Sequence, residues 1–155
     1  MSFRFDSFCG LYCGACDTLI ANMENKVNEL AKNLGRTSED VTCHGCKTTV
    51  NSVHCRKCEL KRCAKDRKIE FCCECPEYPC QRLIDFRHDK YSHHSVVIKN
   101  LDFIKKHGVE YWLREQKSRW SCPECGLNFS WYSEKCGNCG SKLFNCIDEE
   151  ANLEK

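Results

Sequence analysis

Four cysteines in the last quarter of the chain have the spacing that a single metal site requires. The segments CPECG at 122–126 and CGNCG at 136–140 each hold two cysteines separated by two residues. This spacing lets a tight turn present both sulfurs to one ion, and zinc prefers four such ligands in a tetrahedron. The pattern predicts a zinc ribbon, with iron in the same four-sulfur geometry as a minor alternative. The predicted ligands are Cys122, Cys125, Cys136 and Cys139.

Further cysteine pairs with the same spacing lie upstream. They are Cys13/Cys16, Cys43/Cys46, Cys55/Cys58 and Cys72/Cys75. Taken in order, these pairs make two more four-thiolate zinc sites, although crossed pairings agree equally well with the spacing. Three other cysteines could complete a third upstream site together with Cys73, or with His44 or His54. They are Cys9, Cys63 and Cys80. The sequence therefore predicts several zinc ions per chain.

An iron–sulfur cluster is the alternative for these upstream cysteines. Cys9, Cys13 and Cys16 have the spacing C-x3-C-x2-C, which is similar to the cluster motif of radical-SAM enzymes. The similarity stops at spacing, because those enzymes need a larger barrel fold and glycine-rich cofactor strands. The cysteine run of bacterial ferredoxins is absent as well. We expect Cys146 to act as a small buried hydrophobic residue. Cys73, where it is not a ligand, is expected to be a spacer within its turn, with a redox-active thiol as the alternative.

The composition agrees with metal binding in a reducing compartment. Cysteine accounts for 17 of 155 residues, and the mean hydropathy of −0.59 leaves no apolar run long enough to span a membrane. The first residues, MSFRFDSFCG, lack the features of a secretory signal. We therefore expect a cytoplasmic protein, where cysteines are more often metal ligands than disulfides.

The elements that must position these cysteines differ along the chain. Apolar spacing predicts a helix over 17–34, a short helix after residue 80, a longer one from 92 to about 108 and a last one near 109–113. Alternating runs at 127–133 and 141–147 predict two strands. The segment 36–80 holds nine cysteines but only seven large apolar side chains, so metal–thiolate bonds would have to hold it.

These elements predict a small, metal-stabilised α+β protein. Its helical segments would carry cysteine-rich zinc knuckles, and a zinc ribbon hairpin would end the fold. The predicted domains are a cysteine-rich metal-binding domain at 1–88, a helical connector at 89–118, and the zinc ribbon with an acidic tail at 119–155.

The charge pattern bears on possible partners. Each zinc with four thiolates adds a charge of −2, so three sites would lower the formal net charge from +2 to −4. Seven cations at 56–68 would then mainly offset thiolate charge, although they could also bind phosphate. A protein partner is thus favoured over nucleic acid.

Catalytic patterns are scarce, so an enzyme is the less favoured interpretation. The one place that offers histidine and carboxylate together is the run His88, Asp89, Tyr91, His93 and His94. We expect this run to be a solvated helix terminus. The predicted function is structural zinc binding that presents a surface to a protein partner. The alternatives are an iron–sulfur protein in electron transfer or redox sensing, and a zinc ribbon that binds nucleic acid.

The whole set of motifs resembles a group of small, uncharacterised, cysteine-rich bacterial and archaeal proteins. The resemblance rests on CGLYCGAC at 9–16, CHGC at 43–46, CRKC at 55–58 with a later cysteine, and FCCECPEYPC at 71–80. It continues through NLDFIKKHGVEYWLREQ at 100–116 and the terminal cysteine pairs. The resemblance implies zinc binding without a known activity. It also implies that Cys9, Cys63 and Cys80 belong to the ligand set and that Cys73 does not.

Overall fold

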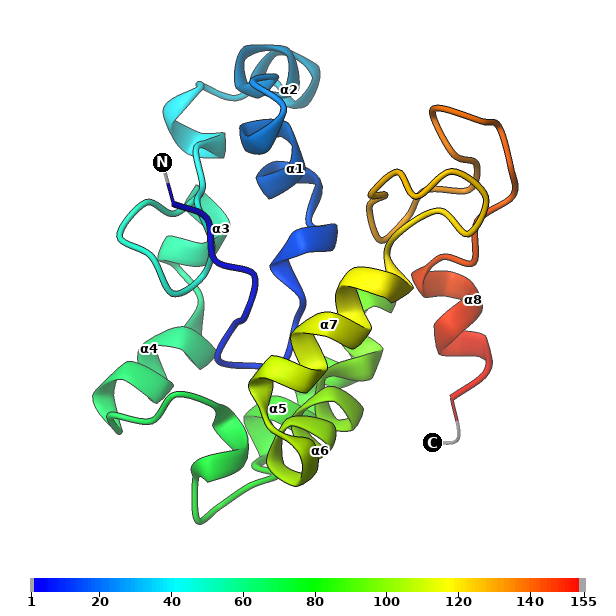
Figure 1. Cartoon of the computed structure of the whole chain (residues 1–155). Coiled ribbons are helices and arrows are strands. Elements are labelled where there is room, and N and C mark those ends of the chain that lie inside the picture. Colours follow the sequence, from blue (N-terminus) through cyan, green and yellow to red (C-terminus); the bar gives the residue numbers. More distant parts are fainter. Residues whose placement is uncertain (1, 154–155) are drawn as a thin grey trace.

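The computed structural model describes residues 2–153 and is built of helices joined by loops (Figure 1). The α-helices are α1 (Asp17–Met23), α2 (Val27–Leu34), α3 (Val53–Arg56), α4 (Glu59–Asp66), α5 (Gln81–Arg87), α6 (Val97–His107), α7 (Val109–Arg119) and α8 (Cys146–Ala151). Short 3₁₀ helices lie between them: η1 (Cys13–Ala15), η2 (Glu39–Val41), η3 (Cys72–Glu74) and η4 (Ser92–Val96). No helix of this described part has both the length and the apolar character that a membrane crossing needs.

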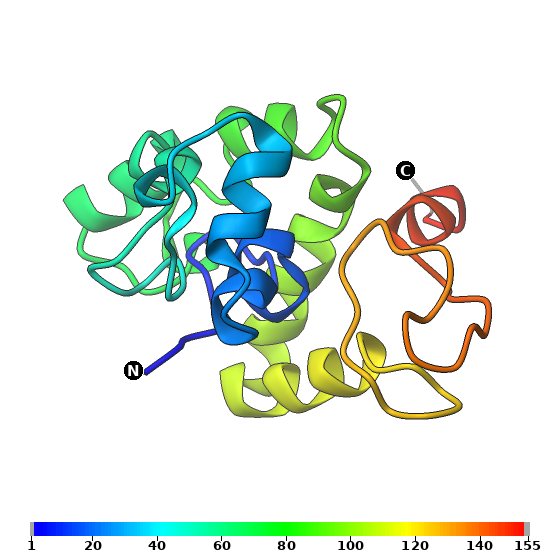
Figure 2. The ribbon, with the colours of Figure 1, turned by 90° about the horizontal axis from the view of Figure 1, so that it is seen from above.

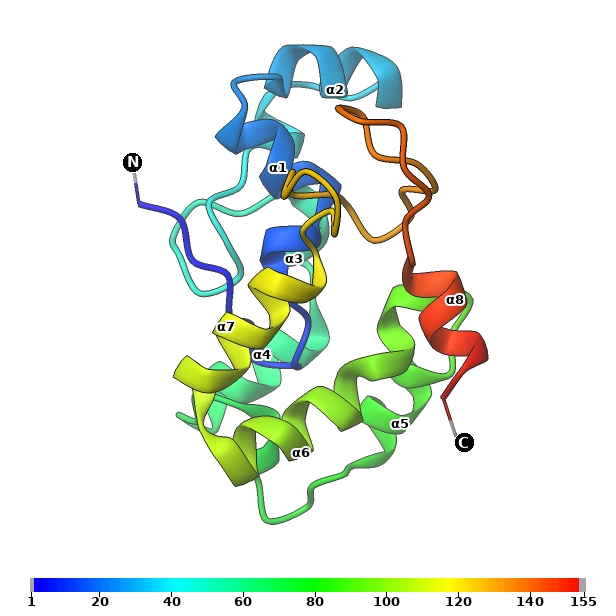
Figure 3. The ribbon, with the colours of Figure 1, turned by 45° about the vertical axis from the view of Figure 1, so that its right-hand side comes forward.

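The two cysteine-rich regions lie on opposite sides of the molecule. Figure 2 shows α3 and α4, in cyan and green, on one side, and the loops before α8, in orange, on the other. The amino-terminal segment, α1 and α6 lie between them. Figure 3 shows α8 beside the segment that leads into α6, and η4 and α8 are in contact. The helical centre of the molecule therefore lies between the carboxyl-terminal cysteines and those near α3 and α4.

The largest part of the core joins the centre to the carboxyl-terminal loops. Trp112 of α7 is 1% exposed and packs with Trp120, Phe129 and Leu143 from the loops that follow. Tyr12 of the amino-terminal segment belongs to the same cluster, and its ring meets that of Trp112 edge to face at 6.1 Å. Segments far apart in sequence thus share one apolar core.

The predicted α+β class with a zinc ribbon hairpin is wrong. Residues 2–153 contain no sheet, and the pairs Ser121–Asn128 and Lys135–Lys142 form isolated β-bridges, each within its own turn. The alternating segment at 127–133 bonds elsewhere, because the Trp131 N–H donates to the Ala15 carbonyl oxygen at 3.1 Å. The alternation of apolar residues reflects packing on the helical core, and not a β-ladder.

The second predicted strand, at 141–147, ends in a helix. Asn145 caps α8, because its side-chain oxygen accepts hydrogen bonds from the N–H groups of Ile147 and Asp148. Asp148 completes the capping box by accepting from the Asn145 N–H at 3.1 Å. Part of the predicted acidic tail is therefore helical, and residues 154–155 lie outside the described chain.

The helix predicted at 17–34 is divided into α1 and α2. Asn25 has a φ of +59°, a left-handed conformation that asparagine tolerates better than most residues. Before the break, the buried Asn22 side chain donates to the Val41 carbonyl oxygen at 2.9 Å and accepts from the Cys43 N–H at 3.1 Å. α1 therefore positions the loop that carries Cys43. Gly35 ends α2 in a left-handed conformation with φ +62°.

The other predicted helices are confirmed, with longer bounds for the last one. They are α5, the η4–α6 segment that ends at Gly108, and α7, which runs on to Arg119. The sequence did not predict α3 and α4, which lie in the cysteine-rich segment. The apolar residues that α4 buries are Leu60 and Ala64, which lie one turn apart. Two such residues are too few to reveal a helix by apolar spacing.

Candidate metal centre

The four carboxyl-terminal cysteines converge on one point. All four sulfur atoms lie within 4.8 Å of one another. The Sγ atoms of Cys122 and Cys139 are 3.6 Å apart, and those of Cys125 and Cys136 are 3.5 Å apart. A tetrahedral zinc ion with bonds of about 2.3 Å separates its sulfurs by about 3.8 Å. The four thiols are therefore spaced to bind one metal ion.

Two turns of the same design hold these cysteines. In the first turn, the Cys122 N–H donates to the Leu127 carbonyl oxygen, and the Gly126 N–H donates to the Cys122 carbonyl oxygen, both at 2.8 Å. In the second turn, the Gly140 N–H likewise donates to the Cys136 carbonyl oxygen at 2.9 Å. Gly126 and Gly140 have φ values of +79° and +74°, which glycine adopts without strain. The glycine after each pair is therefore part of the site.

Polar neighbours favour the thiolate form of two cysteines. A hydrogen bond from the Asn138 side chain lowers the pKa of Cys125 to about 6. Hydrogen bonds from the side chain and the backbone of Ser141 lower the pKa of Cys139. The Asn138 N–H also lies 3.4 Å from Cys136 Sγ. Since the thiolate is the metal ligand, these groups prepare the site at neutral pH. Sequence reasoning missed Asn138 and Ser141, although their places inside and just after the second pair were a usable signal.

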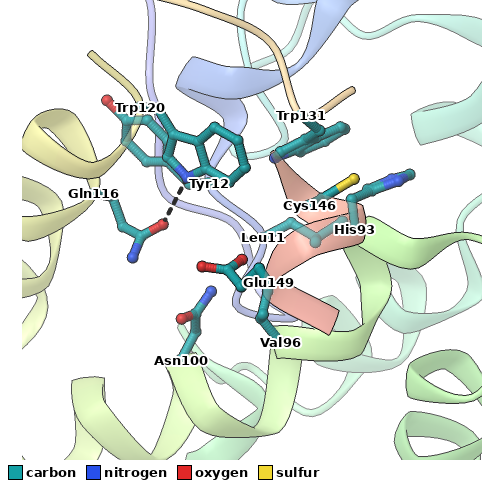
Figure 4. Close-up of a pocket in the computed structure, with 10 residues that line it drawn as sticks. All are labelled: Leu11, Tyr12, His93, Val96, Asn100, Gln116, Trp120, Trp131, Cys146 and Glu149. Carbon is teal, nitrogen blue, oxygen red and sulfur yellow. Dashed lines mark hydrogen bonds between the residues drawn. The ribbon is translucent and has the colours of Figure 1, made fainter. Parts of the chain in front are cut away.

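The helical body fixes the position of the centre. α7 ends one residue before the buried Trp120, whose Nε1–H donates to Gln116 Oε1 at 3.2 Å (Figure 4). The Trp120 ring packs against Phe129 at 5.4 Å between centroids. The Arg119 guanidinium at the end of α7 forms an ion pair with the Glu149 carboxylate of α8 at 3.0 Å. This contact joins the helix that precedes the cysteine turns to the helix that follows them.

A small cavity lies among the amino-terminal segment, η4, α7 and α8, and a residue of the predicted histidine run lines it. Figure 4 shows His93 beside Trp131 and Cys146 in its wall. The rings of His93 and Trp131 stack at 4.0 Å, and His93 Nδ1 lies 2.8 Å from the Tyr132 hydroxyl. Burial lowers the pKa of His93 to about 3. A neutral, stacked His93 joins η4 to the carboxyl-terminal loops.

The rest of that run also packs. His94 stacks on Phe86 at 3.8 Å between centroids, and its Nδ1 lies 2.7 Å from an Asp89 carboxylate oxygen. In the described part of the chain, the histidines and carboxylates of this run do not gather into a group able to hold a metal. The run is a structural contact between helices, and the expectation of a purely solvated helix terminus is too simple.

Four upstream cysteines surround a second place, a cavity between α4, η3 and the start of α5. They are Cys63, Cys72, Cys75 and Cys80. Burial raises the pKa of Cys72 to about 12, and the nearby thiols of Cys80 and Cys63 add to the rise. The structure therefore groups Cys72 and Cys75 with Cys63 and Cys80, whereas pairing in order along the chain would group them with Cys55 and Cys58.

The other upstream cysteines form two neighbouring sets. In the first, burial raises the pKa of Cys9, and the thiols of Cys46 and Cys58 add to the rise. Cys13 belongs to this set, because burial followed by the Cys46 thiol raises its pKa as well. In this first set, burial keeps the thiols in the neutral form until a cation is nearby.

The second set contains Cys16, Cys43 and Cys55. A hydrogen bond from the Cys55 thiol lowers the pKa of Cys43 to about 6 and raises that of Cys55. Burial is the main cause of the raised pKa of Cys16, which is a close neighbour of Cys43. Each of the three upstream pairs before residue 60 is thus split, with one member in each set.

A buried lysine accompanies these thiols. Lys61 is 9% exposed, and its ammonium group donates to the Cys46 carbonyl oxygen at 2.6 Å and to the Asn51 side-chain oxygen. Its charge favours the thiolate form of Cys43 and Cys46. A buried ammonium next to thiols supports the expectation that cations of 56–68 offset thiolate charge.

Cys73 and Cys146 lie apart from these groups. Cys73 is 6% exposed and packs with Leu60 and Leu83, and Cys146 is 1% exposed at the start of α8. Both residues are buried, which agrees with the expectation for Cys146.

Comparison with known proteins identifies the family. A family model described as protein of unknown function (DUF3795) matches residues 5–85, which is more than half of the chain. The chain belongs to this family. The resemblance to an uncharacterised cysteine-rich group is thereby confirmed. The DUF3795 match spans the upstream cysteines from Cys9 to Cys80 and ends before α6 and the carboxyl-terminal four. No curated protein and no solved structure matches the chain.

Proposed function

We propose that this DUF3795 protein is a structural metal-binding protein whose carboxyl-terminal cysteines hold one zinc ion. The observation that carries the proposal is the convergence of four sulfurs within 4.8 Å, with two of their separations at 3.5 and 3.6 Å. Four thiolates complete the coordination of zinc and leave no open position for a substrate. Zinc in such a closed site stabilises a fold and does not activate water.

The zinc ion would hold a part of the chain that has little regular structure. The loops from residue 120 to 145 contain two isolated β-bridges and no helix. Cys122 and Cys136 are buried against the core, whereas Cys125 and Cys139 are exposed. One ion would therefore cross-link the two turns from their outer side, which supports a role in keeping α7 and α8 in place.

Replacement of one ligand tests the proposal. We expect Cys125→Ser to lose about one zinc ion per chain, because three thiolates bind zinc far more weakly than four. Cys125 is exposed, so the substitution removes little packing. The measurement is elemental analysis of protein purified without oxygen.

The matched control is Cys146→Ala, which removes a thiol of the same region that lies outside the four-sulfur group. This variant should keep the zinc content of the parent protein. Equal zinc content in Cys125→Ser and Cys146→Ala would contradict the proposal. Iron in place of zinc at the four sulfurs would contradict the choice of metal.

The finer expectations about partners stay predictions. A protein partner remains favoured over nucleic acid, because the segment 119–155 has four basic and six acidic residues. A metal at the two sets around Cys46 and Cys43, zinc or an iron–sulfur cluster, also remains a prediction.

A further inference from the structure

The cavity enclosed by Cys63, Cys72, Cys75 and Cys80 has no role in the carboxyl-terminal zinc centre. Cys63 lies on α4, Cys72 is the first residue of η3, Cys75 directly follows η3, and Cys80 is the residue before α5. All four residues line the same cavity. Three different elements therefore direct four sulfur-bearing residues to one cavity.

The sulfurs around this cavity are spread more widely than a single ion needs. In residues 2–153, the one group with three or more ligand atoms all within 4.8 Å of one another is the carboxyl-terminal four. Among any three of Cys63, Cys72, Cys75 and Cys80, at least two sulfur atoms are therefore more than 4.8 Å apart. The cysteine sulfurs of a mononuclear zinc site lie about 3.8 Å apart. The cysteine sulfurs around an iron–sulfur cluster lie further apart, because the iron and sulfide atoms of the cluster lie between them.

The surroundings of the cavity also fit a cluster. Apart from the cysteines, its wall is mostly apolar, with Leu60, Ile69 and Leu83 among its residues. Such a wall keeps water from the inorganic sulfides, and cluster properties depend on burial and on hydrogen bonds to sulfur. The Glu77 N–H supplies one such bond to Cys75 Sγ at 3.4 Å.

One cation lies where it would balance the charge of a cluster. The Arg67 guanidinium lines the cavity and forms an ion pair with Glu77. Four thiolates around a cluster carry net negative charge, which a bound guanidinium offsets.

We propose that Cys63, Cys72, Cys75 and Cys80 bind an iron–sulfur cluster in the cavity between α4, η3 and α5. The proposal is independent of the zinc centre, because the two sites share no residue. The protein would then carry two kinds of metal site, one mononuclear and one polynuclear.

The first experiment is iron, sulfide and zinc analysis of the full-length protein, prepared without oxygen and supplied with iron and sulfide during reconstitution. We expect equal amounts of iron and acid-labile sulfide, with visible absorption typical of a cluster. Single serine substitutions of Cys63, Cys72, Cys75 and Cys80 should each remove the iron and sulfide of one cluster. Protein that takes up zinc and no iron or sulfide would overturn the proposal.

Two control variants separate this site from the others. Cys73→Ala changes the neighbour of Cys72 that does not line the cavity, and it should keep the cluster. Cys125→Ser should lose zinc and keep the cluster. Iron and sulfide that persist at parent levels in all four cavity variants would overturn the proposal.

A second measurement needs no variant, in case a cavity variant fails to fold. Alkylation of the iron-loaded parent protein, followed by mass spectrometry, reports which thiols are protected. We expect the four cavity cysteines to be protected and to become reactive when an iron chelator removes the cluster. Equal reactivity of these four thiols before and after iron removal would contradict the proposal.

Discussion

Single polar side chains next to the sulfurs decide how ready the metal centre is at neutral pH. Asn138 lowers the pKa of Cys125 to about 6, and Ser141 lowers that of Cys139. The spacing of the cysteines predicts the ligands, but it does not predict these two residues, because their effect depends on the direction of a side chain within the folded turn. His93 is a similar case, because its stacking on Trp131 joins positions far apart in the sequence.

His93 gives the protein a pH-dependent stability. The pKa of His93 is about 3 in the folded chain and about 6.5 when unfolded. Between these values the unfolded chain binds a proton that the folded chain does not, so stability falls as the pH drops below about 6.5. The slope for one proton is at most about 1.4 kcal/mol per pH unit.

The variant His93→Phe can still stack on Trp131 but cannot be protonated. We expect it to lose less stability than the parent between about pH 7.5 and 5.5, as measured by urea unfolding of metal-loaded protein. Part of the slope should remain, because burial also lowers the pKa of His94. An identical slope in parent and variant would show that His93 does not cause it.

At the scale of elements, local patterns predicted helices better than loops. Apolar spacing identified α5, α6 and α7, because these helices bury one face against the core. The same reasoning missed the break at Asn25, which depends on one left-handed residue. It also interpreted 127–133 as a strand, because a loop that packs alternate side chains on a core has the same sequence pattern as a strand.

The grouping of the upstream cysteines shows a second limit of sequence reasoning. Cys72 and Cys75 lie with Cys63 and Cys80 because residues of α4, η3 and the start of α5 line one cavity. Spacing within a pair constrains a turn, but it does not determine which turns meet. The C-terminal ligand set was easier to predict because its two turns are separated by ten residues.

Gly10 links the first cysteine motif to α6. Its φ is +90°, its carbonyl oxygen accepts from Asn100 Nδ2 at 2.8 Å, and a Cβ atom there would lie 2.8 Å from the Val97 carbonyl oxygen. We expect Gly10→Ala to lower the free energy of unfolding by about 1–3 kcal/mol, because it adds both backbone strain and a backbone clash. Urea unfolding of metal-loaded protein measures the change.

Gly137→Ala is the matched control for Gly10→Ala. A Cβ atom at Gly137 meets no heavy atom within 4 Å, so this variant should unfold close to the parent protein. Equal stability of the Gly10 and Gly137 variants would show that the close approach to α6 is not required.

At the scale of the whole molecule, apolar packing and thiolates support different regions. The centre has large buried side chains, including Trp112, Leu101 and Leu83. The segment 36–80 has few, and its buried residues include the thiols of Cys43, Cys46 and Cys73. Ordering a residue costs about 1.5 kcal/mol, so a segment with so little apolar burial needs another source of stability. Bonds between metal ions and thiolates would supply it.

Hydrogen exchange of the reduced protein, before and after a strong chelator removes its metals, tests this account most directly. The account predicts that amides in 9–80 and 122–143 lose most of their protection, because metal–thiolate bonds hold both regions. Amides of α6 and α7 should lose less, because these helices contain no cysteine and bury large apolar side chains such as Leu101 and Trp112. Unchanged protection of the two cysteine-rich regions in metal-free, disulfide-free protein would contradict the account.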